Sequence, residues 1–183
     1  MTKQNIIKMI RKIVIASVLF LNGMLHAQTL SVGKTVSTVK IQNPDNSPAN
    51  IPAIGQKVVA LFYTDPDVKD INEPLTEAIK AKKYSPDKYV GVGIANMSDT
   101  WMPNSVIRYA GRQKQAKYPA SVIMCDDNHA VSKAWGLGDC DDVGYVIIIG
   151  KDSKVKFIKA VKSAADSKAI ISTVLSLIET DVK

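Results

Sequence analysis

The sequence predicts an α/β fold with a mainly parallel central sheet and an antiparallel hairpin near the carboxyl terminus. Apolar segments of strand length at 58–63, 89–95 and 118–124 alternate with polar or amphipathic stretches of helical length. Two further apolar runs, 143–149 and 154–160, flank a Gly-Lys-Asp-Ser turn, which is typical of a hairpin. Strands that alternate with helices pair in parallel through right-handed crossovers. The 183 residues are enough for one sizeable core.

The amino-terminal half yields two strands and a helix. Weak apolar alternation over 35–42 predicts a half-buried strand, and the dense turn cluster 43–48 follows it. The run 58–63 is apolar on both faces, which indicates a central strand. We expect the next helix to begin at Pro66 and Asp67 and to end at a cluster of lysines. Its buried stripe has residues four apart: Ile71, Leu75 and Ile79.

The carboxyl-terminal half continues the alternation. Asn104 can cap a helix that runs to about Ala116, and a short helix is expected over 128–135. Ser163 and Asp166 form a capping box that opens one closing helix. No repeat or linker divides the chain, so residues 28–183 are predicted to be a single domain.

The first 27 residues have the pattern of a signal peptide. Four basic residues precede an apolar run at 13–25, and small Ala27 occupies the last position before the expected cleavage site. The run is shorter than the ~20 residues that span a bilayer, so an uncleaved anchor is the minor alternative. We therefore expect a periplasmic or secreted protein with no stable membrane insertion after cleavage.

The charge of the remaining chain is modest. Residues 28–183 carry 20 basic and 17 acidic side chains, which favours neither nucleic acid nor an anionic membrane surface as a partner. A basic group remains in the helix expected after Asn104, and we interpret it as a solvated face. Its members are Arg108, Arg112, Lys114 and Lys117.

Three stretches resemble the thioredoxin-like superfamily, in its branch of peroxiredoxins and membrane-tethered thiol-disulfide proteins. Residues 51–63 are similar to the lead-in and redox strand of those proteins. Residues 125–137 resemble a peroxiredoxin segment with the pattern D-x-x-x-x-V-x-x-x-[YW]-G-[VL], and residues 145–155 resemble the hairpin. The resemblance implies a thioredoxin-like three-layer sandwich.

Within this superfamily the chain resembles the YtfJ-type family of bacterial periplasmic proteins. The similar positions are Asn96–Asp99, Lys117–Pro119, Ala134-Trp135 and Lys151-Asp152. The likeness extends from about residue 30 to residue 180. It implies a fold and a compartment, and it supplies no catalytic residue.

Aligned with its redox relatives, the chain lacks their working groups. Asp67 and Asp70 occupy the two positions of a C-x-x-C motif, and Gly144 occupies the position of the opposing proline and of the peroxiredoxin arginine. Disulfide exchange needs a thiolate of lowered pKa, which an aspartate cannot supply. The sequence thus argues against standard disulfide exchange and peroxide reduction.

Cys125 and Cys140 are the two cysteines of the chain. An even number in an exported protein is compatible with a structural disulfide, a labile redox disulfide or two separate thiols. We expect both to lie toward the same end of the sheet. Neighbouring aspartates should raise their pKa and disfavour the thiolate.

Acidic residues suggest two further sites, each with a simpler structural interpretation. The first is a calcium site built from Asp126, Asp127, Asp139, Asp141 and Asp142. The second is acid/base catalysis by Asp65, Asp67, Asp70 and Glu73. Helix caps and polar turns explain both groups without a ligand. His129 is the only histidine beyond residue 27, which argues against a multi-histidine zinc site.

These observations predict a non-catalytic binding or accessory protein of the bacterial envelope, with an unidentified envelope protein as partner and no cofactor or metal. Trp101 is a candidate for an exposed contact, whereas Trp135 is expected in the core. The predicted binding surface is the former active-site end: Thr64, Asp67, Asp70, Trp101 and Gly144. The alternative is an atypical thiol-disulfide oxidoreductase or peroxidase that uses Cys125 and Cys140.

Overall fold

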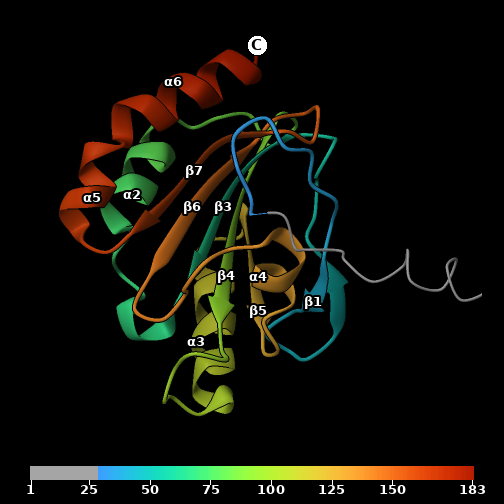
Figure 1. Ribbon diagram of the computed structural model, residues 1–183, viewed down its shortest axis with the longest axis vertical. Helices are drawn as coiled ribbons and strands as arrows, with labels where there is room; N and C mark the ends of the chain where they lie inside the picture. Colours follow the sequence, from blue (N-terminus) through green and yellow to red (C-terminus); the bar gives the residue numbers. More distant parts are fainter. Residues whose placement is uncertain (1–28) are drawn as a thin grey trace, which may run out of the picture.

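A computed structural model describes residues 29–183, which form a mixed sheet between two layers (Figure 1). The α/β class and the carboxyl-terminal hairpin are confirmed. The predicted signal peptide at 1–27 lies outside the described residues. No helix within 29–183 is long and apolar enough to cross a bilayer.

The sheet has seven strands in the order β2-β1-β5-β4-β3-β6-β7. The central strands β3, β4 and β5 are parallel, β6 and β7 form the antiparallel hairpin on one side, and β1 and β2 form another on the opposite side. Strands β2, β3, β4, β5 and β7 therefore run in one direction. The bounds are β1 Lys40–Gln42, β2 Pro48–Asn50, β3 Val58–Thr64, β4 Tyr89–Asn96, β5 Ser121–Asp126, β6 Gly144–Ile149 and β7 Val155–Val161.

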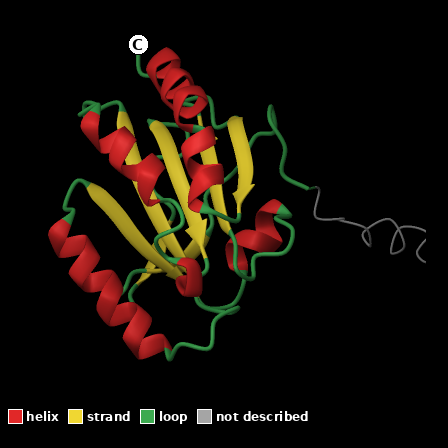
Figure 2. Cartoon of the chain, turned by 90° about the vertical axis from the view of Figure 1, so that its left-hand side faces the viewer, coloured by secondary structure: helices red, strands yellow, loops and turns green. Residues whose placement is uncertain are grey.

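Helices cover both faces of the sheet. Their bounds are η1 Pro66–Val68, α2 Glu73–Ala81, α3 Asn104–Lys117, α4 Ala130–Trp135, α5 Ala164–Ala169 and α6 Ile171–Asp181. Helices α2, α5 and α6 pack on one face, and α4 lies on the other with the amino-terminal segment. Figure 2 looks onto the face that carries α2, α5 and α6.

Strand β3 is buried on both faces, as its sequence predicts. Val59, Leu61 and Tyr63 point into the core beneath α4, whereas Val58 and Ala60 point toward α2 and α6. All five side chains are fully buried. Alternate residues of a strand face opposite sides, so β3 joins the two halves of the core.

Three sequence-based boundaries are wrong. The chain does not enter a helix at Pro66: it forms the short 3-10 helix η1, and α2 begins at Glu73. The carboxylate of Asp65 accepts the Asp67 amide, which stabilises a local turn, and Pro74 suits the first turn of a helix because it needs no amide partner. The closing helix divides at Ile170, and the predicted strand 35–42 is limited to β1.

The start of α2 rests on the start of β6. Gly144 pairs with Thr64 across the β3–β6 ladder, and Asn72, the residue before α2, fills the space above it. A Cβ atom at Gly144 would lie 2.5 Å from Asn72 Nδ2 and 2.8 Å from a methyl carbon of Ile71. Close approach of α2 therefore requires glycine at this position.

We expect Gly144→Ala to destabilise the fold by about 1–3 kcal/mol, because the added methyl overpacks the contact with Asn72 and Ile71. Urea unfolding followed by circular dichroism measures the change. Gly93→Ala is the matched control, since a Cβ atom there meets only Ile123 at an ordinary 3.4 Å.

The cost of Gly144→Ala should fall when Asn72→Ala is present, because the nearest clashing group is then absent. Equal costs in the two backgrounds, or equal effects of the two glycine substitutions, would contradict this packing account.

Candidate functional site

The candidate site is the end of the sheet where β3, β4 and β5 terminate and β6 begins. Four segments meet there, and we call them together the carboxyl end of the sheet. They are Thr64–Asp70, Asn96–Trp101, Asp126–His129 and Asp139–Gly144. The predicted site residues Asp67, Asp70, Trp101 and Gly144 all belong to this end, and so does Thr64.

A buried carboxylate organises the centre of this end. Asp126 is 1% exposed, and its two oxygens accept the amides of Ala130 and Val131 at 2.9 Å. The hydroxyl of Tyr63 donates to the same carboxylate at 3.2 Å. Burial, followed by the negative charge of Asp126, raises the pKa of Tyr63 far above its usual value. Asp126 thus caps α4 and holds Tyr63 as a neutral donor.

A second polar group lies beside it. One oxygen of Asp99 is 2.8 Å from His129 Nε2, and the other accepts the Asn96 side-chain amide at 2.6 Å. Burial raises the pKa of Asp99, but the hydrogen bonds from Asn96 and His129 outweigh it, so the pKa lies below its usual value. This histidine–carboxylate pair is partly exposed, and among the described residues no hydroxyl or thiol is hydrogen-bonded to the imidazole ring of His129.

Asp65, directly after β3, is fully buried and joins two loops. Its carboxylate accepts the amides of Asp67 at 2.9 Å and Asp142 at 2.8 Å. One oxygen each from Asp65, Asp141 and Asp142 lies within 4.8 Å of the others, which is the arrangement best suited to a cation here. Some burial, followed by the charges of Asp142 and Asp65, raises the pKa of Asp141.

The five aspartates of the calcium hypothesis, for which helix caps and turns are the preferred interpretation, do not come together. Asp126 is engaged by α4 and Tyr63, and Asp127 forms an ion pair with Arg108 at 3.1 Å. The helix-cap interpretation therefore holds for Asp126. The structure instead brings Asp65 toward Asp141 and Asp142.

The two positions of the missing C-x-x-C motif are solvent-exposed. Asp67 lies in η1 and accepts the Thr100 hydroxyl at 3.0 Å, and Asp70 pairs with Lys69 in the following turn. Trp101, next to Thr100, is 83% exposed. The Thr100–Asp67 bond therefore joins the turn after β3 to the loop that presents Trp101. Trp135 is buried in the core, as expected.

Gly144 does not belong to an exposed surface, which corrects its assignment as a binding residue. It is buried beneath Asn72, and the Thr64 side chain is half-buried in the same place. The Asn72 side-chain amide lies 3.5 Å from the Thr64 hydroxyl. The exposed part of the predicted surface is reduced to Asp67, Asp70 and Trp101, which we call the loop surface.

The two cysteines lie at the same end of the sheet but on opposite faces, and they form no disulfide. Cys125 packs with Met97 and Ile107 beneath α3. Cys140 belongs to the other core cluster, which also contains Met124, the neighbour of Cys125 in β5. Neighbouring residues of a strand point to opposite faces, so the sheet separates the two sulfurs. Of the three states that the sequence leaves open, the structure shows two separate thiols.

Neither thiol is poised for chemistry. Burial, followed by the charges of Asp99 and Asp139, raises the pKa of Cys140 to about 11. Burial also raises the pKa of Cys125, although the nearby Arg108 opposes the shift. At pH 7 a pKa of about 11 leaves roughly one thiol in ten thousand ionised, which is unfavourable for nucleophilic attack.

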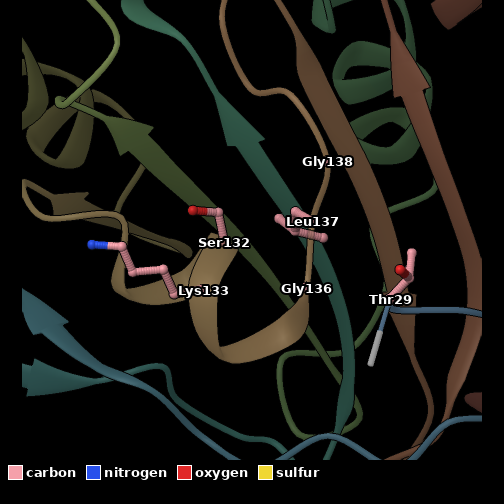
Figure 3. Close-up of a pocket in the computed structure, with 6 residues that line it drawn as sticks. All are labelled: Thr29, Ser132, Lys133, Gly136, Leu137 and Gly138. Carbon is pink, nitrogen blue, oxygen red and sulfur yellow. The ribbon is translucent and has the colours of Figure 1, made fainter. Parts of the chain in front are cut away.

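A shallow groove lies beside α4 (Figure 3). Its volume is about 360 Å³, and it is lined by Thr29, Ser132, Lys133, Gly136, Leu137 and Gly138. Lys133 points away from Leu137 and Thr29, and its amine donates to the backbone oxygen of Asn128 at 2.9 Å. The groove thus directs no charged group at a ligand.

Sequence reasoning missed the Tyr63–Asp126 and Asp99–His129 pairs. A signal for the first was available, because Tyr63 and Asp126 each stand near the end of a predicted central strand. The second pair depends on the conformation of the loop after β4, which no local pattern specifies.

We expect the stability of the protein to fall between pH 9 and 11, and Cys140→Ala to remove part of that fall. The folded-state pKa of the Cys140 thiol exceeds its unfolded value of 9.0. The contribution of the neutral, buried thiol to the free energy of unfolding is therefore fully present below pH 9 and is lost as the pH rises toward 11. Its size is on the order of 2 kcal/mol. Unfolding titrations at pH 8, 9 and 10 measure it, and the range below pH 10 limits the similar contribution of Tyr63. Parallel curves for the variant and the wild type would contradict the prediction.

The chain is similar to solved thioredoxin-like proteins at the level of fold. A peroxiredoxin-like protein from Aquifex aeolicus superposes with a TM-score of 0.55, 13% identity and coverage of 82% of this chain and 90% of that one. The exposed lipoprotein thioredoxin Etrx1 from Streptococcus pneumoniae gives a TM-score of 0.53, 14% identity and coverage of 76% and 99%. At these identities the likeness establishes the fold alone.

Two relatives are closer in sequence, and both are described as uncharacterized. A Haemophilus influenzae protein is 34% identical over 111 residues, which are 60% of this chain and 59% of that protein. Escherichia coli YtfJ is 31% identical over 93 residues, 50% of this chain and 49% of its own length. The alignments thus cover about half to three fifths of these relatives. A family model described as "Bacterial protein of unknown function (YtfJ_HI0045)" matches residues 54–181, and the chain belongs to this family.

Proposed function

We propose that this protein is a non-catalytic binding or accessory protein of the bacterial envelope, built on a thioredoxin-like scaffold without its redox centre. The observation that carries the proposal is the loop surface. There the two C-x-x-C positions hold exposed carboxylates, and Trp101 is 83% exposed beside them. Large exposed aromatic groups are favourable anchors for a protein partner.

Three other carboxylates of the carboxyl end are engaged within the fold. The carboxylate oxygens of Asp65 and Asp126 accept hydrogen bonds from backbone amides, and the carboxylate of Asp99 is hydrogen-bonded to Asn96 and His129. Asp67 and Asp70 remain exposed to solvent. This division of roles favours recognition at the loop surface over catalysis at the buried carboxylates.

The envelope location rests on the amino-terminal pattern. Basic residues, an apolar run and Ala27 precede the domain in the order of a secretory signal. A periplasmic or secreted protein would meet its partner there, and we propose an envelope protein as that partner.

Affinity capture from an envelope fraction tests the proposal, with the wild type and two loop-surface variants as baits. We expect a protein that the wild type enriches to be lost with Trp101→Ala, which removes the anchor, and with Asp67→Lys, which reverses the adjacent charge. Quantitative mass spectrometry measures each enrichment.

Matched controls make the same chemical changes elsewhere. Val32→Ala truncates another exposed apolar side chain, and Asp87→Lys reverses an exposed acid in the turn before β4. Both control baits should retain the partner. Equal enrichment by all five baits, or no enrichment by the wild type, would count against the loop surface.

The alternative, an atypical thiol oxidoreductase or peroxidase, makes an opposite prediction. We expect no insulin reduction or peroxide consumption above background, because both thiols are buried and have raised pKa values. Activity that disappears in Cys125→Ser or Cys140→Ser would overturn the non-catalytic proposal.

A further inference from the structure

Exposed apolar side chains gather on one short stretch of the described chain. Four large hydrophobic residues are strongly exposed within 29–183, and three of them fall between positions 101 and 109. Trp101 is 83% exposed, Tyr109 59% and Val106 51%. Val32, the fourth, lies far away in sequence. Such clustering on a surface indicates a contact site.

Helix α3, which carries two of the three, has mixed polarity on both faces, and Ile107 is its buried apolar residue. Its inward face contains Gln115, which bonds to the backbone of β5 at Ser121 and Ile123, and the buried Arg108. The Arg108 guanidinium donates to the side-chain oxygen of Gln42, to the carboxylate of Asp127 and to the backbone oxygen of Asn43. A surface helix normally turns its polar side chains to solvent.

The outward face of α3 is therefore partly apolar. Val106, Tyr109, Gln113 and Lys117 recur at intervals of three or four, and all are exposed. Trp101 precedes the first turn of the same helix. Figure 1 shows α3 at the lower end of the sheet, below α2, α5 and α6.

The charge on this helix is of one sign. Helix α3 contains four basic residues and no acidic one, and Arg108 is the member paired with an acid, Asp127. Arg112, Lys114 and Lys117 stay exposed along its length. The Lys117 amine lies 5.2 Å from the ring centre of Tyr118, and the Lys80 amine of α2 lies 3.8 Å from it but is ion-paired with Glu77 at 2.6 Å.

We propose that this face docks on an anionic lipid surface. The three apolar side chains would enter the headgroup region, and the cationic side chains would lie against lipid phosphates. We call it the α3 face: Trp101, Val106, Tyr109, Arg112, Lys114 and Lys117.

Charge and residue type select this occupant over two others. A second copy of the chain would bring two basic helices together, which is unfavourable. Protein interfaces are depleted in lysine, whereas surfaces that lie on membranes combine lysine and arginine with tryptophan and other large apolar residues. A lipid surface also needs no deep groove.

The inference goes beyond the proposed function and shares only Trp101 with it. Asp67, hydrogen-bonded to Thr100, places a negative charge beside Trp101. That charge repels an anionic surface. Asp67→Lys should therefore strengthen binding to anionic lipid while it weakens capture of a protein partner, and the two proposals can fail separately.

Vesicle co-sedimentation tests the proposal. The sample is the full chain, expressed in its host so that any natural cleavage has taken place. The vesicles are phosphatidylcholine alone or an equal mixture with phosphatidylglycerol. We expect binding to the mixed vesicles only, weakened by salt, with a blue shift of tryptophan emission. Trp135 is buried, so the shift reports Trp101.

Variants locate the surface. Lys114→Glu with Lys117→Glu should weaken binding at least about tenfold. Trp101→Ala with Tyr109→Ser should abolish the blue shift and reduce binding. Lys151→Glu with Lys168→Glu is the matched control, because both lysines are exposed, on the β6–β7 turn and on α5. Unchanged thermal unfolding confirms that each variant is folded.

Four outcomes would overturn the proposal. These are no binding to mixed vesicles, equal binding to both vesicle types, equal losses in the control pair, and dimerisation through the α3 face detected by light scattering. All variants share the same amino terminus, so binding that is equal in every variant would assign the effect to residues before 29 and would also overturn it.

Discussion

The carboxylate of Asp126 is the interaction on which the centre of this fold depends. Asp126 is the last residue of β5. Its carboxylate caps α4 by accepting two backbone amides, and it also accepts the hydroxyl of Tyr63 from β3. Its own backbone oxygen accepts the Met97 amide at the end of β4. A charge that is 1% exposed is tolerated only when its oxygens are fully hydrogen-bonded. The three parallel strands and α4 therefore hold fixed positions at the end of the sheet where redox relatives act.

That constraint explains how this end of the sheet is ordered without help from a cysteine. The order of the carboxyl end comes from buried carboxylates and backbone amides, with Asp65 repeating the role of Asp126 one loop away. No cysteine takes part in these contacts, and neither thiol is exposed. The side chains of Asp67 and Asp70 take no part in this network and are exposed to solvent, although the backbone amide of Asp67 donates to Asp65.

The sequence was sufficient for the fold class, the central strand β3 and the contrast between Trp101 and Trp135, because apolar periodicity reports burial directly. It was insufficient for the two cysteines. The face of the sheet on which each cysteine lies depends on where β5 ends and on the path of the loop before β6. A shift of one residue moves a side chain to the opposite face of the sheet. The burial of Gly144 was also hidden, since it depends on Asn72, a residue brought there by the β3–β6 register.

Buried polar side chains also shape helix α3, whose exposed surface carries Val106 and Tyr109. Arg108 and Gln115 lie inside with Ile107, where they hold Gln42 and the backbone of β5, so the inward face of the helix is only partly apolar. Val106 and Tyr109 lie on the outer face, where the exposure of their apolar surface to water is unfavourable. Electrostatics separates this face from the loop surface: basic side chains line α3, whereas carboxylates surround the turn at Asp67. A single partner would have to satisfy opposite charges over a few residues, so two different partners, meeting at Trp101, agree better with the charge pattern.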